Sequence, residues 1–178
     1  MAPSSSKSLQ LVHLDDDPFE RERVKAALEG NNLGTPIQVT CVSSPEEFRK
    51  VVKKKKPDIV LLDIHLDKEG ADGIDLASTM DELAPDAVVL MFSTADDAAT
   101  IGRCLKGGAD DFISKQSDKG ELSLRIIHSY KLARLKSTAA PQPDSKPTGT
   151  SKFTGTTMRT IAKRIPLMID SAISAVHV

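Results

Sequence analysis

The stretch Pro57-Asp58-Ile59-Val60-Leu61-Leu62-Asp63-Ile64-His65-Leu66 is an apolar run that ends on a carboxylate. A run of branched aliphatic residues without alternating polar positions is typical of a central strand buried on both faces of a parallel sheet. Asp63 then lies at the carboxyl end of that strand. Because ligands bind at this edge of open α/β sheets, Asp63 is a candidate functional residue.

The chain on either side of this strand alternates between strand and helix patterns. Acids followed by Pro18, and the capping box Ser44-Pro45-Glu46-Glu47, indicate two helix starts. Besides the central strand, the pattern predicts strands at 9–14, 37–42, 87–92 and 111–114, and helices at 18–29, 45–56, 73–83, 98–106 and 118–136. Right-handed crossovers then give an α/β fold, a doubly wound sheet of five parallel strands with helices on both faces.

Composition narrows the class of protein. The 178 residues carry a net charge of -1, which suits one domain with an appendage and gives no sign of binding to nucleic acid or to an anionic membrane. No apolar run reaches the roughly 18 to 20 residues that span a bilayer, so we expect a soluble, cytoplasmic protein. Cys41 and Cys104 stand far apart and the histidines show no ligand spacing, which argues against a disulfide framework and a zinc site. The run 53–56 of four lysines is most simply a solvated helix end.

Chemically reactive residues follow four of the predicted strands: Asp15-Asp16, Asp63, Ser93 and Lys115. Three carboxylates at one edge repel one another, so the folded site must bind a cation or raise a pKa, and an all-oxygen site suits Mg²⁺. A lysine and a hydroxyl complete a phosphoryl site in which Asp63 is the best nucleophile. The alternative is that these are ordinary loop acids of an α/β protein. It does not explain why all four positions lie at the same edge of the sheet.

These residues resemble the receiver domain of bacterial two-component response regulators, over about residues 9 to 136. The resemblance rests on the order and spacing of short motifs rather than on any one of them. The motifs are Leu14-Asp15-Asp16-Asp17-Pro18, Val60-Leu61-Leu62-Asp63, Asp72-Gly73, Ser93-Thr94-Ala95 and the run from Gly108 to Lys115. The implied fold is the flavodoxin-like receiver fold.

The resemblance implies a phosphoryl acceptor and a metal site. Asp63 would accept a phosphoryl group from a sensor histidine kinase. Asp16, Asp63 and the backbone carbonyl of His65 would hold Mg²⁺, with Asp15 acting through a metal-bound water. The side chain of His65 is expected either to tune dephosphorylation or simply to be exposed, whereas His13 is expected to be a core histidine.

The resemblance also implies how a signal would leave the site. Lys115 would pair with the phosphoryl group. Ser93 would move inward to donate to it, and the ring of Phe112 would fill the space that Ser93 vacates. A homodimer would form through the face made by the helix at 98–106, the strand at 111–114 and the last helix, with Arg103, Lys106 and Asp110 on its exposed side.

Two departures from the family pattern affect the predicted site. The loop after Asp63 is longer than usual, with Asp67-Lys68-Glu69-Gly70 in place of a proline turn. Gln116 follows Lys115 where the family has a proline, so we expect a trans peptide there and a less defined lysine pose.

The domain organisation follows from these patterns. Residues 1–8 are expected to be a disordered leader, 9–136 the receiver domain, 137–150 a proline-rich linker and 151–178 a truncated or remnant output domain. This last segment resembles the start of the AAA+ domain of sigma-54-type activators, but it lacks the glycine-rich phosphate loop, so ATPase activity is not expected. An amphipathic tail is the alternative.

Three functions compete for this sequence. The first is a phosphorylation-dependent signalling switch that is not itself an enzyme beyond slow self-catalysed phosphorylation and dephosphorylation. The second is an interaction module of the same fold that does not switch by phosphorylation. The third, a phosphohydrolase, ranks last because no separate general base is visible in the sequence.

Overall fold

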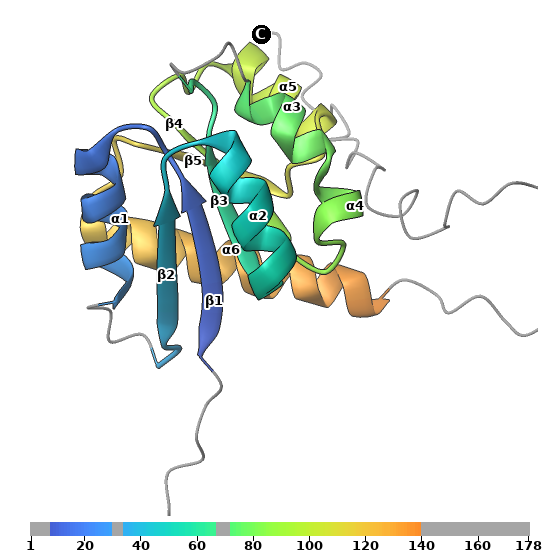
Figure 1. The fold of residues 1–178 in the computed structure, drawn as a ribbon, viewed down its shortest axis with the longest axis horizontal. Helices are drawn as coiled ribbons and strands as arrows, with labels where there is room; N and C mark the ends of the chain where they lie inside the picture. Colours follow the sequence, from blue (N-terminus) through green and yellow to red (C-terminus); the bar gives the residue numbers. More distant parts are fainter. Residues whose placement is uncertain (1–7, 30–33, 67–71, 140–178) are drawn as a thin grey trace, which may run out of the picture.

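The computed structural model describes residues 8–29, 34–66 and 72–139. In these residues five parallel strands form one sheet in the order β2-β1-β3-β4-β5, with β3 at its centre (Figure 1). The strands are β1 (Leu9–Leu14), β2 (Ile37–Val42), β3 (Ile59–Asp63), β4 (Val88–Ser93) and β5 (Asp111–Ser114). Every residue of β3 is buried, as its unbroken apolar run predicts. The predicted fold class is therefore confirmed.

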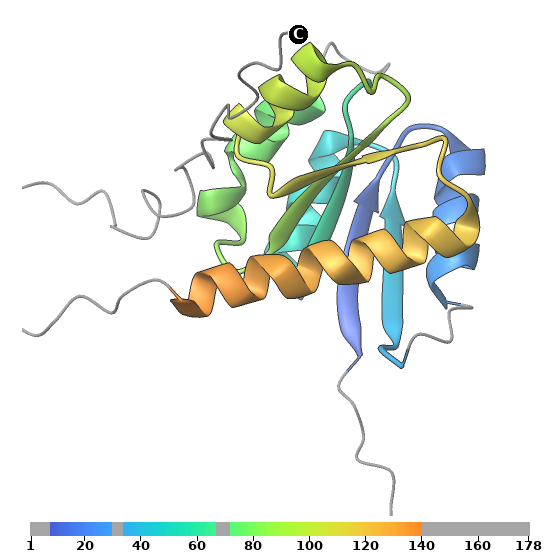
Figure 2. The ribbon, with the colours of Figure 1, turned by 180° about the vertical axis from the view of Figure 1, so that it is seen from behind.

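Helices cover both faces of the sheet. They are α1 (Pro18–Glu29), α2 (Pro45–Lys55), α3 (Gly73–Ser78), α4 (Met80–Leu83), α5 (Ala98–Lys106) and α6 (Lys119–Ala139). Val60 and Leu62 of β3 belong to the core under α2, α3, α4 and α5, whereas Ile59 and Leu61 belong to the core under α1 and α6. Figure 2 shows α6 lying across the second face. Alternate residues of one strand thus supply two separate cores.

The helix predicted at 73–83 is broken in the structure, and this prediction is wrong in detail. α3 ends at Ser78 and α4 begins at Met80, with Thr79 in a turn between them. The Thr79 hydroxyl donates to the Leu76 carbonyl at 2.8 Å, and the Ser78 hydroxyl donates to the Asp75 carbonyl at 2.7 Å. Hydroxyls that bond to backbone carbonyls three residues earlier compete with the helical hydrogen bonds, so the helix ends there.

Helix ends elsewhere agree better with the sequence. α1 begins at Pro18, and the Ser44 hydroxyl accepts a hydrogen bond from the Glu47 amide at 3.3 Å. The reciprocal bond of the capping box is shifted by one residue, because Glu47 accepts from the Ser43 amide instead of the Ser44 amide. α6 continues to Ala139, so residues 137–139 are helical rather than part of the predicted linker.

Several predictions fall outside the described residues. These are the leader up to residue 7, the loop at 67–71, the linker from residue 140 and the segment 151–178 with its resemblance to an AAA+ domain. In the part that the structure does describe, no helix is both long enough and apolar enough to cross a membrane.

Candidate functional site

The register of the sheet brings the predicted site residues together. Leu14 pairs with Leu62, so Asp15 and Asp63 are each the next residue along neighbouring strands. Ser93 pairs with Ser114, and the Lys115 amide donates to the Ser93 carbonyl at 2.8 Å. All four spots therefore lie at the carboxyl edge of β1, β3, β4 and β5.

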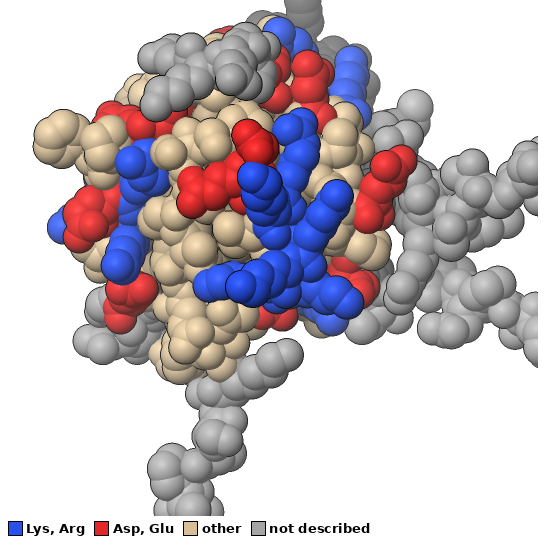
Figure 3. All heavy atoms as spheres, viewed as in Figure 1, with Lys and Arg blue, Asp and Glu red and all other residues tan. Residues whose placement is uncertain are grey.

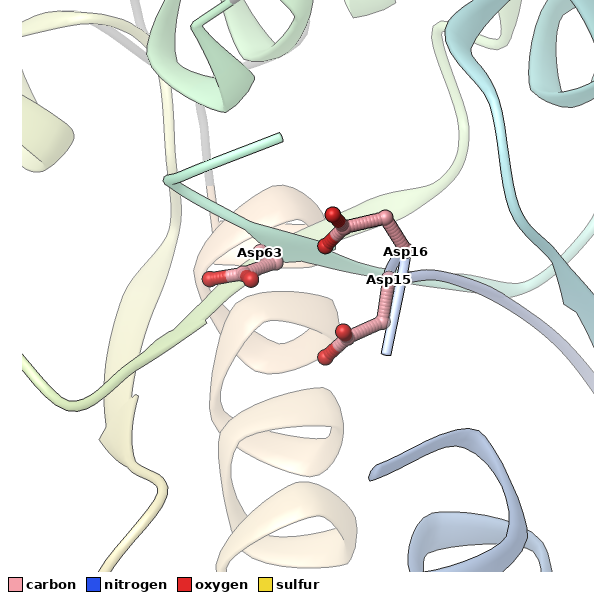
Figure 4. A group of neighbouring side chains, drawn as sticks. All are labelled: Asp15, Asp16 and Asp63. Atoms are coloured by element: carbon pink, nitrogen blue, oxygen red, sulfur yellow. The ribbon is translucent and has the colours of Figure 1, made fainter. Parts of the chain in front are cut away.

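Three carboxylates form the acidic part of the site. Asp15, Asp16 and Asp63 each offer an oxygen, and these oxygens lie within 4.8 Å of one another. Figure 4 shows the two residues at the end of β1 beside Asp63 at the end of β3. Asp15 is fully buried and Asp63 is 5% exposed. Charges this close, and this poorly solvated, require a compensating cation.

Lys115 supplies positive charge at this cluster. Its Nζ lies 2.8 Å from Oδ2 of Asp15 and 2.8 Å from Oδ2 of Asp63. Burial acts to lower the pKa of the lysine, but the bonds to the two carboxylates outweigh it and the net pKa is raised. Burial raises the pKa of Asp15, and the ammonium opposes that shift. The peptide bond from Lys115 to Gln116 is trans, as predicted, but the lysine has a defined pose between the two carboxylates, which differs from the expected less defined pose.

The two predicted switch residues, Ser93 and Phe112, are both buried. Ser93 is 1% exposed, and its hydroxyl accepts a hydrogen bond from the Ala95 amide at 3.3 Å. The Phe112 ring is already in the core, 6% exposed, in the same cluster as Met91 and Cys104. The proposed movement of this ring into space vacated by Ser93 stays a prediction, and it would start from a ring that is already buried.

The approach of α3 to Asp63 requires a glycine. A Cβ added to Gly73 would lie 1.9 Å from the backbone oxygen of Asp63, so no side chain fits there. The Gly73 amide donates to the Ile64 carbonyl at 2.9 Å, and the Asp72 carboxylate caps the helix at the Ile74 amide. The Asp72-Gly73 motif therefore holds the start of α3 against the backbone of Asp63 and Ile64. His65 in that loop has an exposed side chain, and its amide approaches Oδ1 of Asp63 at 3.4 Å.

Two further residues, His13 and Arg21, contact Asp15 or the backbone of the acidic cluster. His13 is buried, as predicted for a core histidine, with Nδ1 3.2 Å from the Leu61 carbonyl and Nε2 3.7 Å from Oδ2 of Asp15. Burial lowers the pKa of His13 to about 3, so the ring is neutral at pH 7. Arg21 was not predicted as a site residue. Its Nη1 donates to the backbone carbonyls of Asp15 and Asp16, both at 2.8 Å. Its place in the first turn after the acids is the only sequence signal.

Comparison with known proteins identifies the family. Residues 11–127 match the family model of the response regulator receiver domain. The chain is 31% identical over 116 residues to the transcriptional regulatory protein CseB of Streptomyces coelicolor, covering 65% of this chain and 47% of that protein. It is 29% identical over 119 residues to the transcriptional regulatory protein DegU of Brevibacillus brevis, covering 66% and 48%. The chain thus spans about half the length of these curated relatives.

Solved structures agree on the fold. A response regulator from Thermotoga maritima superposes with a TM-score of 0.62 at 24% identity, over 70% of this chain and 99% of that one. At this identity the likeness concerns the fold alone, whereas the family model matches well over half of the sequence. Fold, edge residues and family match together show that the chain belongs to the response regulator receiver domain family.

Proposed function

We propose that this domain is a signalling switch in which Asp63 accepts a phosphoryl group from a sensor histidine kinase. The observation that carries the proposal is the ion pair of Lys115 with both Asp63 and the fully buried Asp15. A buried carboxylate that ends the central strand and has a cation beside it is poised for anionic chemistry. The family to which the chain belongs supports the same assignment.

The reaction uses few groups of the protein. An oxygen of Asp63 attacks phosphorus, the bond between phosphorus and the histidine nitrogen of the kinase breaks, and an acyl phosphate forms on Asp63. Lys115 stays close enough to pair with the new phosphoryl oxygens, and the Ser93 hydroxyl donates to one of them. Among the described residues we assign no separate general base, so activity beyond slow self-catalysed phosphorylation and dephosphorylation is not part of the proposal.

The acidic cluster fits Mg²⁺. Its three carboxylates lie within 4.8 Å of one another and are hard oxygen donors, the ligand type that Mg²⁺ prefers. Asp15, Asp16, Asp63 and the backbone carbonyl of His65 would hold the ion. When bound, Mg²⁺ supplies positive charge that offsets repulsion between the carboxylates and the incoming phosphoryl group.

The output surface is proposed to be the face of α5, β5 and α6, through which two copies would associate. Leu105 is 47% exposed on α5, and Arg103 and Lys106 are exposed beside it. Asp110, expected on the same face, is only partly exposed, and its carboxylate accepts a hydrogen bond from the Val89 amide at 2.8 Å. Ser93→Ala should still bind a phosphoryl mimic but lose most of the mass increase that light scattering detects on activation. Equal association of both proteins would exclude this route.

A second candidate function is an interaction module that does not switch. The burial of Phe112 favours it, because a ring that is already packed in the core cannot report phosphorylation by moving inward. No direct contact with nucleic acid or membrane is proposed for this chain in either case.

Beryllofluoride, which mimics a phosphoryl group, separates the two candidates. It should bind the wild-type domain only when Mg²⁺ is present, giving a bound signal in ¹⁹F NMR that Asp63→Asn lacks. Absence of that signal in well-folded wild-type protein would leave the non-switching module as the function.

A further inference from the structure

Arg23 links α1 to the loop that carries Lys115. Its Nη2 donates to the Lys115 carbonyl at 3.0 Å, and its Nη1 donates to the Ser117 carbonyl at 3.1 Å. These two carbonyls flank Gln116. One side chain from the first half of the chain therefore holds the backbone on both sides of the residue after the lysine.

The guanidinium is itself fixed from two other directions. Nε and Nη2 donate to the Glu20 carboxylate at 3.0 and 2.7 Å, one helical turn earlier in α1. The central carbon of the guanidinium lies 5.3 Å from the centroid of the Phe92 ring, over its face. Only the planar, five-donor group of arginine can make such a set of bonds at once, because a lysine offers a single nitrogen.

The Lys115 amide ties the start of this loop to β4 through the Ser93 carbonyl, at 2.8 Å, but the residues that follow Lys115 are held less firmly by their own sequence. Gln116 lacks the ring that would restrict φ at this position. Within the loop, the Ser117 amide donates to the Ser114 carbonyl at 3.2 Å, and the Gln116 amide donates to the Ser114 hydroxyl at 3.2 Å. Both are local bonds that cannot tie the loop to α1.

We propose that Arg23 is a positioning residue, which fixes the backbone at Lys115 so that the ammonium reaches both Asp15 and Asp63. The proposal rests on the proposed function only where its test measures phosphoryl uptake. The hydrogen bonds of Arg23 go to Glu20 and to the backbone at Lys115 and Ser117, and not to the carboxylates of Asp15 and Asp63, so its effect on the reaction should pass through Lys115.

A double-mutant cycle separates positioning from plain stabilisation. Arg23→Ala should slow the uptake of phosphoryl groups from acetyl phosphate by on the order of tenfold, measured where circular dichroism shows every variant folded, because small misplacements of a reactive group reduce rates this much or more. Arg23→Lys should behave in the same way, since it keeps the charge and loses the fork. In a Lys115→Ala background, Arg23→Ala should change the residual rate less than about twofold.

Arg125 provides a matched control. This α6 arginine donates to the Phe112 carbonyl of β5 at 3.2 Å and lies 3.9 Å from Glu121 one turn away, so it resembles Arg23 in kind but does not contact the 115–117 backbone. Arg125→Ala should leave the rate of phosphoryl uptake within about twofold of wild type.

The position of the lysine can also be read without any phosphoryl chemistry. In ¹⁵N NMR of the unmodified domain, the Lys115 ammonium should give a protected signal, assigned by its loss in Lys115→Ala, that disappears in Arg23→Ala and persists in Arg125→Ala. Failure of wild type to take up phosphate would refute the proposed function and leave this readout valid. The positioning role is refuted if Arg23→Ala keeps the ammonium signal, or if it slows uptake equally with and without Lys115.

Discussion

Two dense groups of charge stand out among the described residues, one exposed and one buried. The lysine run 53–56 is exposed at the end of α2, and basic side chains gather over that helix in Figure 3. Asp15, Asp63 and Lys115 are less conspicuous in the sequence, yet Asp15 has no exposed surface and both acids contact the same ammonium. Solvent screens the first group, whereas the second must be balanced within the protein. Burial, rather than charge density along the chain, therefore marks the functional cluster.

The largest expected effect comes from removing the cation of the buried group. Lys115→Met leaves two buried carboxylates without their partner and should lower the free energy of unfolding by about 3 kcal/mol at pH 7 without divalent ions. Urea unfolding measures this, with Asp63→Asn/Lys115→Met as the control, which should recover part of the loss. If the free energy of unfolding were unchanged in Lys115→Met, removing a charge from the buried cluster would cost no more stability than removing one from the lysine run 53–56.

A metal should act on the same group. Mg²⁺ at 10 to 100 times its dissociation constant should stabilise the wild-type domain by roughly 1 to 3 kcal/mol, by mass action. Asp16→Asn should abolish most of that gain, which thermal melting with and without Mg²⁺ would detect. A full Mg²⁺ shift in Asp16→Asn would remove Asp16 from the ligand set.

A smaller effect follows from the pKa of Asp15. Burial raises that pKa above its value in the unfolded chain, so the folded state holds the proton to higher pH and the ionised carboxylate costs stability above the folded pKa. This cost vanishes as the pH falls below the unfolded pKa. Asp15→Asn should therefore be more stable than wild type at pH 7, by less than the effect of Lys115→Met, and the gap should narrow towards pH 4 in urea titrations. If the difference in stability between Asp15→Asn and wild type widened as the pH fell, the pKa of Asp15 would not be raised by folding.

The exposed group should show almost no effect. Replacing Lys53 and Lys54 by glutamine should change the free energy of unfolding by less than about 0.5 kcal/mol, because exposed charges of this kind contribute little. Phosphoryl uptake should also stay at the wild-type rate. If stability or phosphoryl uptake fell as far in this variant as in Lys115→Met, the distinction between the two charge groups would be wrong.

The sequence predicts the periodic patterns, and it fails where the structure depends on which of several local bonds forms or on contacts between residues far apart in the chain. The apolar run of β3, the acids after β1 and the lysine after β5 fix the fold and the edge of the site, because parallel strands align their carboxyl ends. The break at Thr79 depends on which carbonyl a hydroxyl selects, and the burial of Phe112 depends on packing under α5. The hydrogen bond from Arg23 to the Lys115 carbonyl joins residues 92 positions apart. No local sequence pattern can predict such a contact.

The most direct test of the central claim is the intact mass of the domain after incubation with acetyl phosphate and Mg²⁺. Wild type should gain one phosphoryl group, and omission of Mg²⁺ or the change Asp63→Asn should prevent the gain, while Lys53→Gln/Lys54→Gln should gain it normally. Uptake by well-folded Asp63→Asn equal to that of wild type, or no uptake by wild type, would contradict the assignment of the buried charge group as the phosphoryl-accepting site.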